Sequence, residues 1–214
     1  MISGSWYVIR DIPNFKELYS KNRLLEENLA NMELELLKLK EDKIENQRLR
    51  ELLDFTERNK HKFIPSIVIA RDSLASYSTI IIDKGKKDGV KKDMPVISGA
   101  GLVGRVYESG WSISRVILIT SNDLAVGSIV QRTRDIGVVT GDPNLGLIMK
   151  YLELDCEVKS GDKVITSGFS GIYEKGMLIG EVVRLEEDDS GLYIKAIIKP
   201  ETDMMKLEEV LVIK

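Results

Sequence analysis

The sequence predicts a mainly β protein with one long helix at its N-terminal end. The segment Phe15–Leu53 contains no glycine or proline and repeats apolar residues at a heptad spacing. From Phe63 onward, short β-branched runs alternate with glycine and Asp-Lys turns. A repeat of 3.5 residues is typical of paired helices, and a period of two is typical of strands.

The bulk composition fits a globular chain and excludes several classes of function. The chain has 214 residues, of which 43% are hydrophobic and 30% charged, enough for one large or two small cores. A net charge of -3 gives no global field that attracts nucleic acid, so we expect no nucleic-acid partner. The single cysteine, Cys156, excludes an intramolecular disulfide and a multi-cysteine metal site. No apolar run reaches the roughly 20 residues of a membrane span.

Residues 15–57 are predicted to form a coiled-coil dimerisation helix. The predicted dimerisation seam consists of Leu18, Asn22, Leu25, Leu29, Met32, Leu36 and Leu39. Asn22 is the kind of polar seam residue that fixes register and oligomeric state. Lys43 and Arg50 interrupt the seam, and a second stripe is formed by Leu34, Leu37 and Ile44. A single amphipathic helix lying on the chain's own β body is the alternative.

The rest of the chain is predicted to form about a dozen short strands. They are Phe63–Arg71, Thr79–Asp83, Pro95–Ser98, Leu102–Glu108, Ser114–Thr120, Ala125–Val130, Ile136–Thr140, Leu147–Tyr151, Lys163–Thr166, Leu178–Leu185, Tyr193–Pro200 and Leu207–Ile213. Their spacing is too short for the helical crossovers of a parallel sheet, so the pattern indicates β-barrels or sandwiches. Residues 58–62 are polar and charged, which predicts a hinge.

An internal repeat lies within the β region. Val90–Ser98 parallels Val158–Thr166, and each copy is followed by a glycine-rich turn and a Gly-x-Val strand. These strands contain Gly104–Val106 and Gly180–Val182. We therefore expect two similar β units.

Two sequence motifs resemble nucleotide-binding or catalytic sites, but the residues around them do not fit those functions. Gly99–Gly104 matches the dinucleotide fingerprint with Asp123 beyond it, but no helix pattern opens at its third glycine, so we expect a β-turn. Ser167 and Ser170 have no recognisable base, because the only histidine, His61, lies in the hinge. We therefore predict no catalytic, cofactor-binding or metal-binding residues and no enzymatic activity.

Two further motifs resemble metal sites. Asp83–Gly89 contains three lysines and the wrong ligand spacing for calcium, so it is predicted to be a charged turn. The acidic run Glu186–Asp189 lies between two strand patterns and is predicted to be a hairpin loop.

Two glycine-punctuated stretches, Gly161–Val182 and Gly85–Ile97 with its sequel Gly101–Val106, resemble the signature of the rod shape-determining protein MreC family. The helix that runs into Leu49–Leu53 is similar too, and the resemblance spans residues 15 to 214. Glu174 departs from it, because many members carry proline there, and a solvent-facing turn is expected to tolerate this change.

The resemblance implies a coiled-coil helix followed by two small six-stranded antiparallel β-barrels, similar to those of chymotrypsin-like proteases but without catalytic machinery. We expect residues 63–101 and 168–214 to form the first barrel and residues 102–167 to form an inserted second barrel. Sequential barrels that divide near residue 141 are the alternative.

The resemblance also implies a scaffold of bacterial cell-wall elongation that is needed for rod shape. The implied partners are a second copy in a dimer, class B penicillin-binding proteins, MreD and MreB. A single membrane span outside these residues is implied, with this region periplasmic or extracellular, and residues 1–14, with Trp6 and Tyr7, would be a juxtamembrane segment. The alternatives are a periplasmic adaptor of an efflux or secretion system, or a catalytically dead protease fold.

Overall fold

The computed structural model describes the backbone of residues 12–58, 62–71, 79–188 and 190–214, and the side chains of these residues except 12–18 and 54–58. The predicted juxtamembrane segment 1–14 and hinge 58–62 therefore lie mostly outside the described residues. The helical elements are α1 (Ile12–Arg58) and the 3₁₀ turns η1 (Lys86–Asp88) and η2 (Met204–Lys206). The strands are β1 (Phe63–Arg71), β2 (Thr79–Ile82), β3 (Pro95–Ile97), β4 (Leu102–Ser109), β5 (Ser114–Leu118), β6 (Ala125–Val130), β7 (Ile136–Asp142), β8 (Gly146–Leu152), β9 (Lys163–Thr166), β10 (Leu178–Glu187), β11 (Ile194–Pro200) and β12 (Glu209–Ile213).

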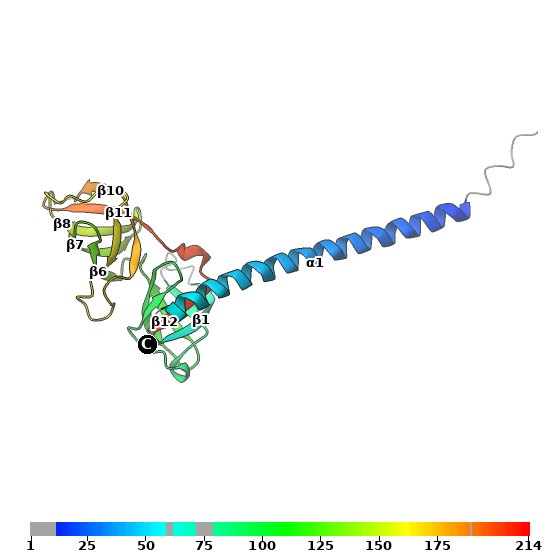
Figure 1. Cartoon of the computed structure of the whole chain (residues 1–214), viewed down its shortest axis with the longest axis horizontal. Helices are drawn as coiled ribbons and strands as arrows, with labels where there is room; N and C mark the ends of the chain where they lie inside the picture. Colours follow the sequence, from blue (N-terminus) through cyan, green and yellow to red (C-terminus); the bar gives the residue numbers. More distant parts are fainter. Residues whose placement is uncertain (1–11, 59–61, 72–78, 189) are drawn as a thin grey trace, which may run out of the picture. The chain divides into compact units, whose positions relative to one another are not determined.

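The helix α1 is continuous over 47 residues, which corresponds to about 70 Å at the usual helical rise (Figure 1). It is rich in leucine, glutamate and lysine, which favour helix, and Pro13 lies in its first turn, where a missing N–H costs nothing. An exposed ion pair between Arg23 and Glu27, 3.2 Å apart, links one turn to the next. The described residues up to Leu53 form one unit, and those from Asp54 onward form another.

The first barrel, called barrel 1, is closed in the order β1-β12-β3-β4-β5-β2 with every pair antiparallel. Figure 1 shows β12, at the C-terminal end, beside β1, and their register joins Phe63 to Ile213. Its fully buried side chains include Ile80, Ile82, Val96, Leu102, Val106, Val116 and Val212. Closure leaves no free sheet edge, so six short strands are enough to surround a core.

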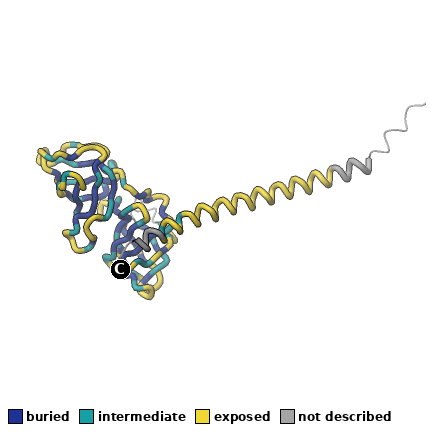
Figure 2. Tube along the Cα trace, viewed as in Figure 1, coloured by how far each residue is buried: buried dark blue, intermediate teal, exposed yellow. Residues whose placement is uncertain are grey.

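The second barrel, called barrel 2, is closed in the order β10-β11-β8-β7-β6-β9. Its strands follow one another in sequence between β5 and β12 of barrel 1. The buried core includes Val126, Val139, Ile148, Met149, Val164, Val182 and Ile198. Figure 2 shows this division of burial, with dark strands in both barrels and an exposed surface along the described part of α1. The predicted fold class is confirmed.

The strand pairings correct the predicted boundaries of the barrels. β4 and β5 belong to barrel 1, although residues 102–167 were assigned to the inserted barrel. β10 and β11 belong to barrel 2, although residues 168–214 were assigned to the first barrel. The physical reason is that β3 pairs with β4 and β9 pairs with β10, so the predicted boundaries at 101 and 167 cut two hairpins in half. Strands that are consecutive in sequence and antiparallel usually pair. Each copy of the internal repeat, together with its Gly-x-Val strand, contains both strands of one hairpin, so the repeat pattern was consistent with the observed pairing.

Candidate interaction surfaces

The predicted dimerisation seam lies along α1, and its described side chains face solvent. Leu25, Leu29, Met32, Leu36 and Leu39 are each between 55% and 66% exposed. Asn22 is exposed as well, whereas the side chain of Leu18 lies outside the described residues. Residues seven apart return to nearly the same side of a helix, so these side chains form a stripe along α1.

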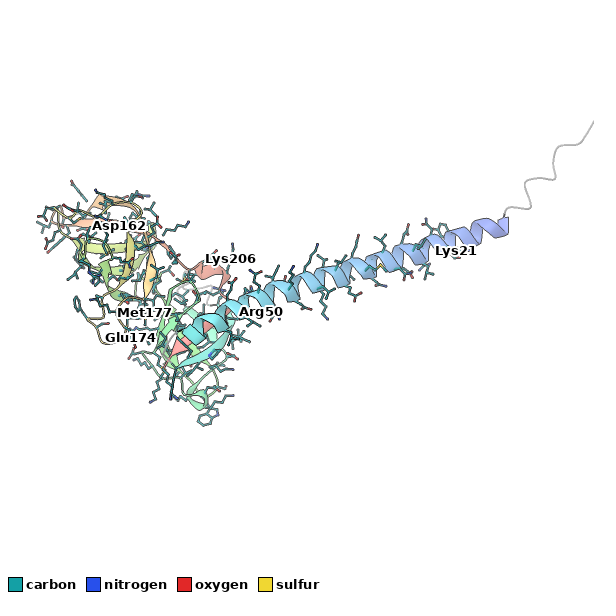
Figure 3. All side chains as sticks on the ribbon, in the orientation of Figure 1. Lys21, Arg50, Asp162, Glu174, Met177 and Lys206 are labelled. Carbon is teal, nitrogen blue, oxygen red and sulfur yellow. The ribbon has the colours of Figure 1, made fainter. Side chains whose placement is uncertain are left out.

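The second stripe on α1 is just as exposed. Leu34, Leu37 and Ile44 have more than half of their surface in solvent. Figure 3 shows side chains projecting from every side of the helix between Lys21 and Arg50. A helix that leaves this much leucine in water is not stable alone, because most helical stability comes from packing an apolar face.

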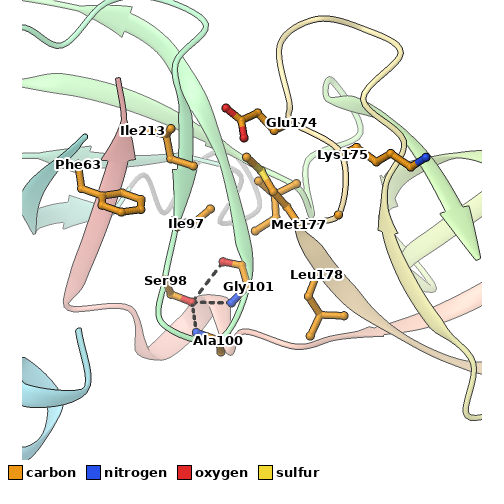
Figure 4. A pocket seen from close by; sticks show the side chains of 12 residues that line it. Phe63, Ile97, Ser98, Ala100, Gly101, Glu174, Lys175, Met177, Leu178 and Ile213 are labelled. Atoms are coloured by element: carbon orange, nitrogen blue, oxygen red, sulfur yellow. Dashed lines mark hydrogen bonds between the residues drawn. The ribbon is translucent and has the colours of Figure 1, made fainter. Parts of the chain in front are cut away.

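A cleft of about 320 Å³ lies between the β3–β4 hairpin of barrel 1 and the loop between β9 and β10 of barrel 2 (Figure 4). Ser98 shapes one wall, because its Oγ accepts hydrogen bonds from the backbone N–H groups of Ala100 and Gly101, both at 3.2 Å. The same oxygen lies 2.7 Å from Oγ1 of Thr202. A Cβ on Gly101 would lie 2.7 Å from the carbonyl oxygen of Leu178, so only glycine allows this approach.

The loop between β9 and β10, residues 167–177, is held closed at its base by buried Thr166. Its hydroxyl donates to the carbonyl oxygen of Glu174 and accepts from the N–H of Met177 at 3.0 Å; Figure 3 labels both residues. The side chain of Glu174 is exposed, so the expectation of a solvent-facing turn is confirmed. Proline at this position would keep the carbonyl that Thr166 uses, which explains why both residues fit.

Tyr173, from the same loop, is 4% exposed, and its hydroxyl has no hydrogen-bond partner among the described residues. Burial raises the pKa of this phenol far above its usual range. In barrel 1, the charge of Arg105 lowers this pKa and the charge of Asp93 raises it. The ring therefore contributes apolar packing rather than a polar contact. Sequence reasoning missed this burial, because no period or motif marks Tyr173 as a core residue.

An aromatic patch on barrel 2, formed by Tyr151, Leu192 and Tyr193, is exposed. The two tyrosine rings meet edge to face with centroids 5.6 Å apart. Tyr151 has a φ of 67°, which places it in the left-handed region, and the register of β8 with β11 shifts at this point. Tyr151 lies in β8 and Tyr193 directly precedes β11. Exposed tyrosines held against each other are suited to protein contacts, because they bury a large area for little lost entropy. Sequence reasoning missed this patch.

Residues that resembled chemical motifs lie in ordinary structural positions. Gly99–Gly104 spans the β3–β4 turn and the start of β4, where a dinucleotide site needs a helix. Ser167 is buried with Gly127 against it, and the Oγ of Ser170 accepts the N–H of Ile172. The only histidine, His61, which was predicted to lie in the hinge, is outside the described residues. Within the described residues no group of three acidic, histidine or cysteine side chains is placed to hold a metal, and no helix is long and apolar enough to span a bilayer.

Charged contacts stabilise the turn that precedes β9. Arg132 makes two hydrogen bonds to the carboxylate of Asp162, at 2.7 and 2.8 Å, and Asp162 also accepts the N–H of Lys159 at 2.8 Å. The Arg132 hydrogen bond holds the pKa of the buried Asp162 carboxyl below its usual range. This pair shapes a loop and does not line the cleft or the aromatic patch.

The fold agrees with comparisons to known proteins. The family model described as the barrel core of rod shape-determining protein MreC matches residues 68–214. The chain is 36% identical over 222 aligned positions to the cell shape-determining protein MreC of Listeria monocytogenes, covering 100% of this chain and 73% of that protein.

Solved structures give the same result. The MreC structure from Listeria monocytogenes superposes with a TM-score of 0.67 and 35% identity, covering 93% of this chain and 95% of that one. A complex between the penicillin-binding protein PBP2 and MreC from Helicobacter pylori contains a chain that is 18% identical, with a TM-score of 0.59 over 72% of this chain and 99% of that one, which shows the shared fold. The chain belongs to the MreC family of cell shape-determining proteins.

Proposed function

We propose that this chain is a non-enzymatic scaffold of bacterial cell-wall elongation that dimerises through α1 and binds a class B penicillin-binding protein through barrel 2. The observation that carries the proposal is the pair of exposed apolar surfaces in an MreC-family chain: the leucine seam of α1 and the Tyr151–Tyr193 patch. MreD and MreB are further proposed partners. A membrane span outside these residues would anchor this region in the periplasm or outside the cell.

Dimerisation is supported by the amount of leucine that α1 leaves in solvent. Pairing two such helices would cover the seam of each with the seam of the other, at about 25 cal/mol for each Å² removed from water. The test is sedimentation of Leu25→Lys/Leu36→Lys beside a matched control, Leu34→Lys/Leu37→Lys, which adds the same charge to the second stripe. We expect monomers for the first variant and dimers for the control. The reverse result would make the second stripe the interface, and two unchanged dimers would move it to the barrels.

Binding to a synthase is supported by the chemistry of the aromatic patch and by the Helicobacter pylori relative, whose structure is a complex with PBP2. Tyrosines that are already held against each other lose little freedom on binding and are frequent hot spots, where truncation costs about 2 kcal/mol or more. We expect Tyr151→Ala/Tyr193→Ala to weaken binding to the extracytoplasmic domain of a class B penicillin-binding protein by roughly 30-fold.

The control for this experiment is Trp111→Ala, which removes a more exposed aromatic ring from barrel 1. It is expected to leave the affinity for the synthase unchanged. Equal losses in the two variants would mean that binding is nonspecific and would overturn the assignment to barrel 2.

The absence of catalysis is proposed from the surroundings of the serines. Ser167 is buried and its Oγ accepts from the N–H of Phe169, so it is not presented to a substrate. Incubation of the parent and His61→Ala with peptide and nucleotide substrates is expected to give no turnover. A peptidase activity that His61→Ala abolishes would replace the scaffold proposal with an enzymatic one.

A further inference from the structure

A cluster of lysines on barrel 1 is not used by the proposed scaffold function. The cluster, called the lysine patch, consists of Lys86, Lys87, Lys91, Lys92 and Lys214, all of them exposed. Three of these lysines line a hollow of about 720 Å³, together with Tyr107 and Ser109. The Lys214 ammonium lies 3.4 Å from the position that a Cβ on Gly89 would take, so the C-terminal strand brings a fifth charge to the same turn.

The acidic residues around the lysine patch already have partners. They are Asp83 with Lys84 at 2.7 Å, Asp88 with the N–H of Gly85 at 3.0 Å, Asp93 with Arg105, and Glu108 with Arg115 at 3.2 Å. The five lysines of the patch form no ion pair within the described part of the chain. Asp88 accepts only a backbone N–H and keeps its charge, so five exposed lysines are opposed by one uncompensated carboxylate, and this end of barrel 1 carries a net positive surface.

Apolar side chains stand directly beside the lysine patch. The N–H groups of Lys86 and Lys87 donate to the carbonyl oxygens of Gly110 and Trp111 at 2.9 and 3.1 Å, which ties η1 to the β4–β5 hairpin. Trp111, at the tip of that hairpin, is 75% exposed, and Ile113 is nearly half exposed. A Cβ on Gly85 would lie 2.6 Å from the carbonyl oxygen of Trp111, so the turn and the hairpin are packed backbone against backbone.

We propose that this face of barrel 1 binds the surface of an anionic lipid bilayer. The lysines would lie against headgroup phosphates, and Trp111 would occupy the interfacial region where tryptophan is enriched. A soluble polyanion would use the lysines but would gain nothing from the exposed indole and Ile113. The combination of charge and interfacial apolar side chains therefore favours a membrane, with binding that is reversible because each contribution is small.

The experiment is flotation of the full chain with vesicles that contain phosphatidylglycerol and phosphatidylcholine in equal parts, compared with phosphatidylcholine alone. We expect binding to the anionic vesicles only, and weaker binding as ionic strength rises. Lys86→Gln/Lys87→Gln is expected to weaken binding by roughly tenfold or more, and Trp111→Ala by about threefold.

The matched control is Lys159→Gln/Lys199→Gln, which removes the same charge from exposed positions on barrel 2. It is expected to bind vesicles as the parent does. Equal weakening by both lysine pairs, or a parent that does not float with anionic vesicles, overturns the proposal. If soluble polyphosphate binds as tightly as vesicles and Trp111→Ala changes neither, the partner is a soluble polyanion and not a membrane.

Discussion

The two copies of the internal repeat build the same backbone in the two barrels but carry different side chains. In barrel 1 the N–H of Asp93 donates to the carbonyl of Val106 at 2.9 Å, and the N–H of Val106 donates to Met94. In barrel 2 the N–H of Gly161 donates to Val182 at 2.8 Å, and the N–H of Val182 donates to Asp162.

The strand glycines are equivalent too. Val96 pairs with Gly104 in barrel 1, and Val164 pairs with Gly180 in barrel 2. Backbone path is therefore common to both copies, whereas the surface that each copy presents differs. The copy in barrel 1 contributes Lys91 and Lys92 to the lysine patch, and the copy in barrel 2 contributes Asp162 to the Arg132–Asp162 pair. The comparison separates residues that fix the turn from residues that are free to acquire a binding role.

The largest expected effect concerns the glycine that both copies share. A Cβ on Gly104 would lie 1.9 Å from the carbonyl oxygen of Ile117, and one on Gly180 would lie 2.2 Å from that of Lys199. Backbone atoms of a neighbouring strand cannot yield, so Gly104→Ala and Gly180→Ala should each lower the free energy of unfolding by about 3 kcal/mol or more. Urea unfolding measures this loss.

Gly99→Ala is the control for these variants, because a Cβ there meets no atom within 4 Å. It should change the free energy of unfolding by no more than about 0.5 kcal/mol. If Gly104→Ala were tolerated while Gly180→Ala was not, the two hairpins would differ in packing. The two copies of the repeat would then not share a requirement for glycine at this position.

The next effect compares one aspartate from each copy of the repeat, at adjacent rather than equivalent positions. Asp162 is buried and accepts bonds from Arg132 and from a backbone N–H, so Asp162→Asn should cost about 2 kcal/mol. Asp93 is more exposed, and Asp93→Asn, which removes the charge from its ion pair with Arg105, should cost less than about 1 kcal/mol. Thermal unfolding of both variants tests the difference, and equal losses would show that burial does not distinguish the two copies.

Acid provides an independent measure of the buried pair. Because Arg132 holds the pKa of Asp162 below its usual range, the unfolded chain takes up this proton at a higher pH than the folded chain does. The contribution of the pair is therefore complete above about pH 5 and is lost as the pH falls below about 4, through the folded pKa. The stability gap between the parent and Asp162→Asn should narrow between about pH 6 and about pH 3. A gap that stays constant would contradict the ionic role of Asp162.

Sequence patterns predicted the parts of this molecule that depend on local periodicity. The heptad pattern predicted the position of α1, and the β-branched runs predicted the strands to within a few residues. Both patterns depend only on residues that are close together in sequence. Barrel membership was wrong for β4, β5, β10 and β11, because closure depends on contacts that are distant in sequence. The Gly-x-Val sequel of each repeat copy held the missing information, since it marks a hairpin that must stay within one barrel.

The surfaces were predicted unevenly for a related reason. The seam of α1 follows directly from spacing, and its pairing stays a prediction. The Tyr151–Tyr193 patch depends on a bulge with a left-handed tyrosine, which no sequence period reports. The turn Asp83–Gly89 was predicted as a charged turn, but the sequence does not show which of its aspartates pairs with a lysine. In the structure Asp83 pairs with Lys84, whereas Asp88 accepts the backbone N–H of Gly85.

The smallest expected effect tests whether turn geometry alone is common to the two copies. Asp93 has a φ of 68° and Gly161, at the same place in the other copy, has a φ of 93°, so both occupy the left-handed region. Asp93→Gly removes that strain but also loses the ion pair with Arg105 and increases the freedom of the unfolded chain. These contributions are similar in size and opposite in sign, so the free energy of unfolding should change by less than about 0.5 kcal/mol.

Asp93→Ala loses the same ion pair and keeps a Cβ in the left-handed region, without the local hydrogen bonding that makes aspartate tolerable there. It should therefore be less stable than Asp93→Gly by about 1 kcal/mol. The reciprocal change, Gly161→Ala, should cost a similar amount, because a Cβ there meets only the Glu181 carboxylate at 3.9 Å and strain is the main penalty. Urea unfolding of the three variants measures the order. If Asp93→Ala were as stable as Asp93→Gly, the left-handed turn would not be what the two copies share.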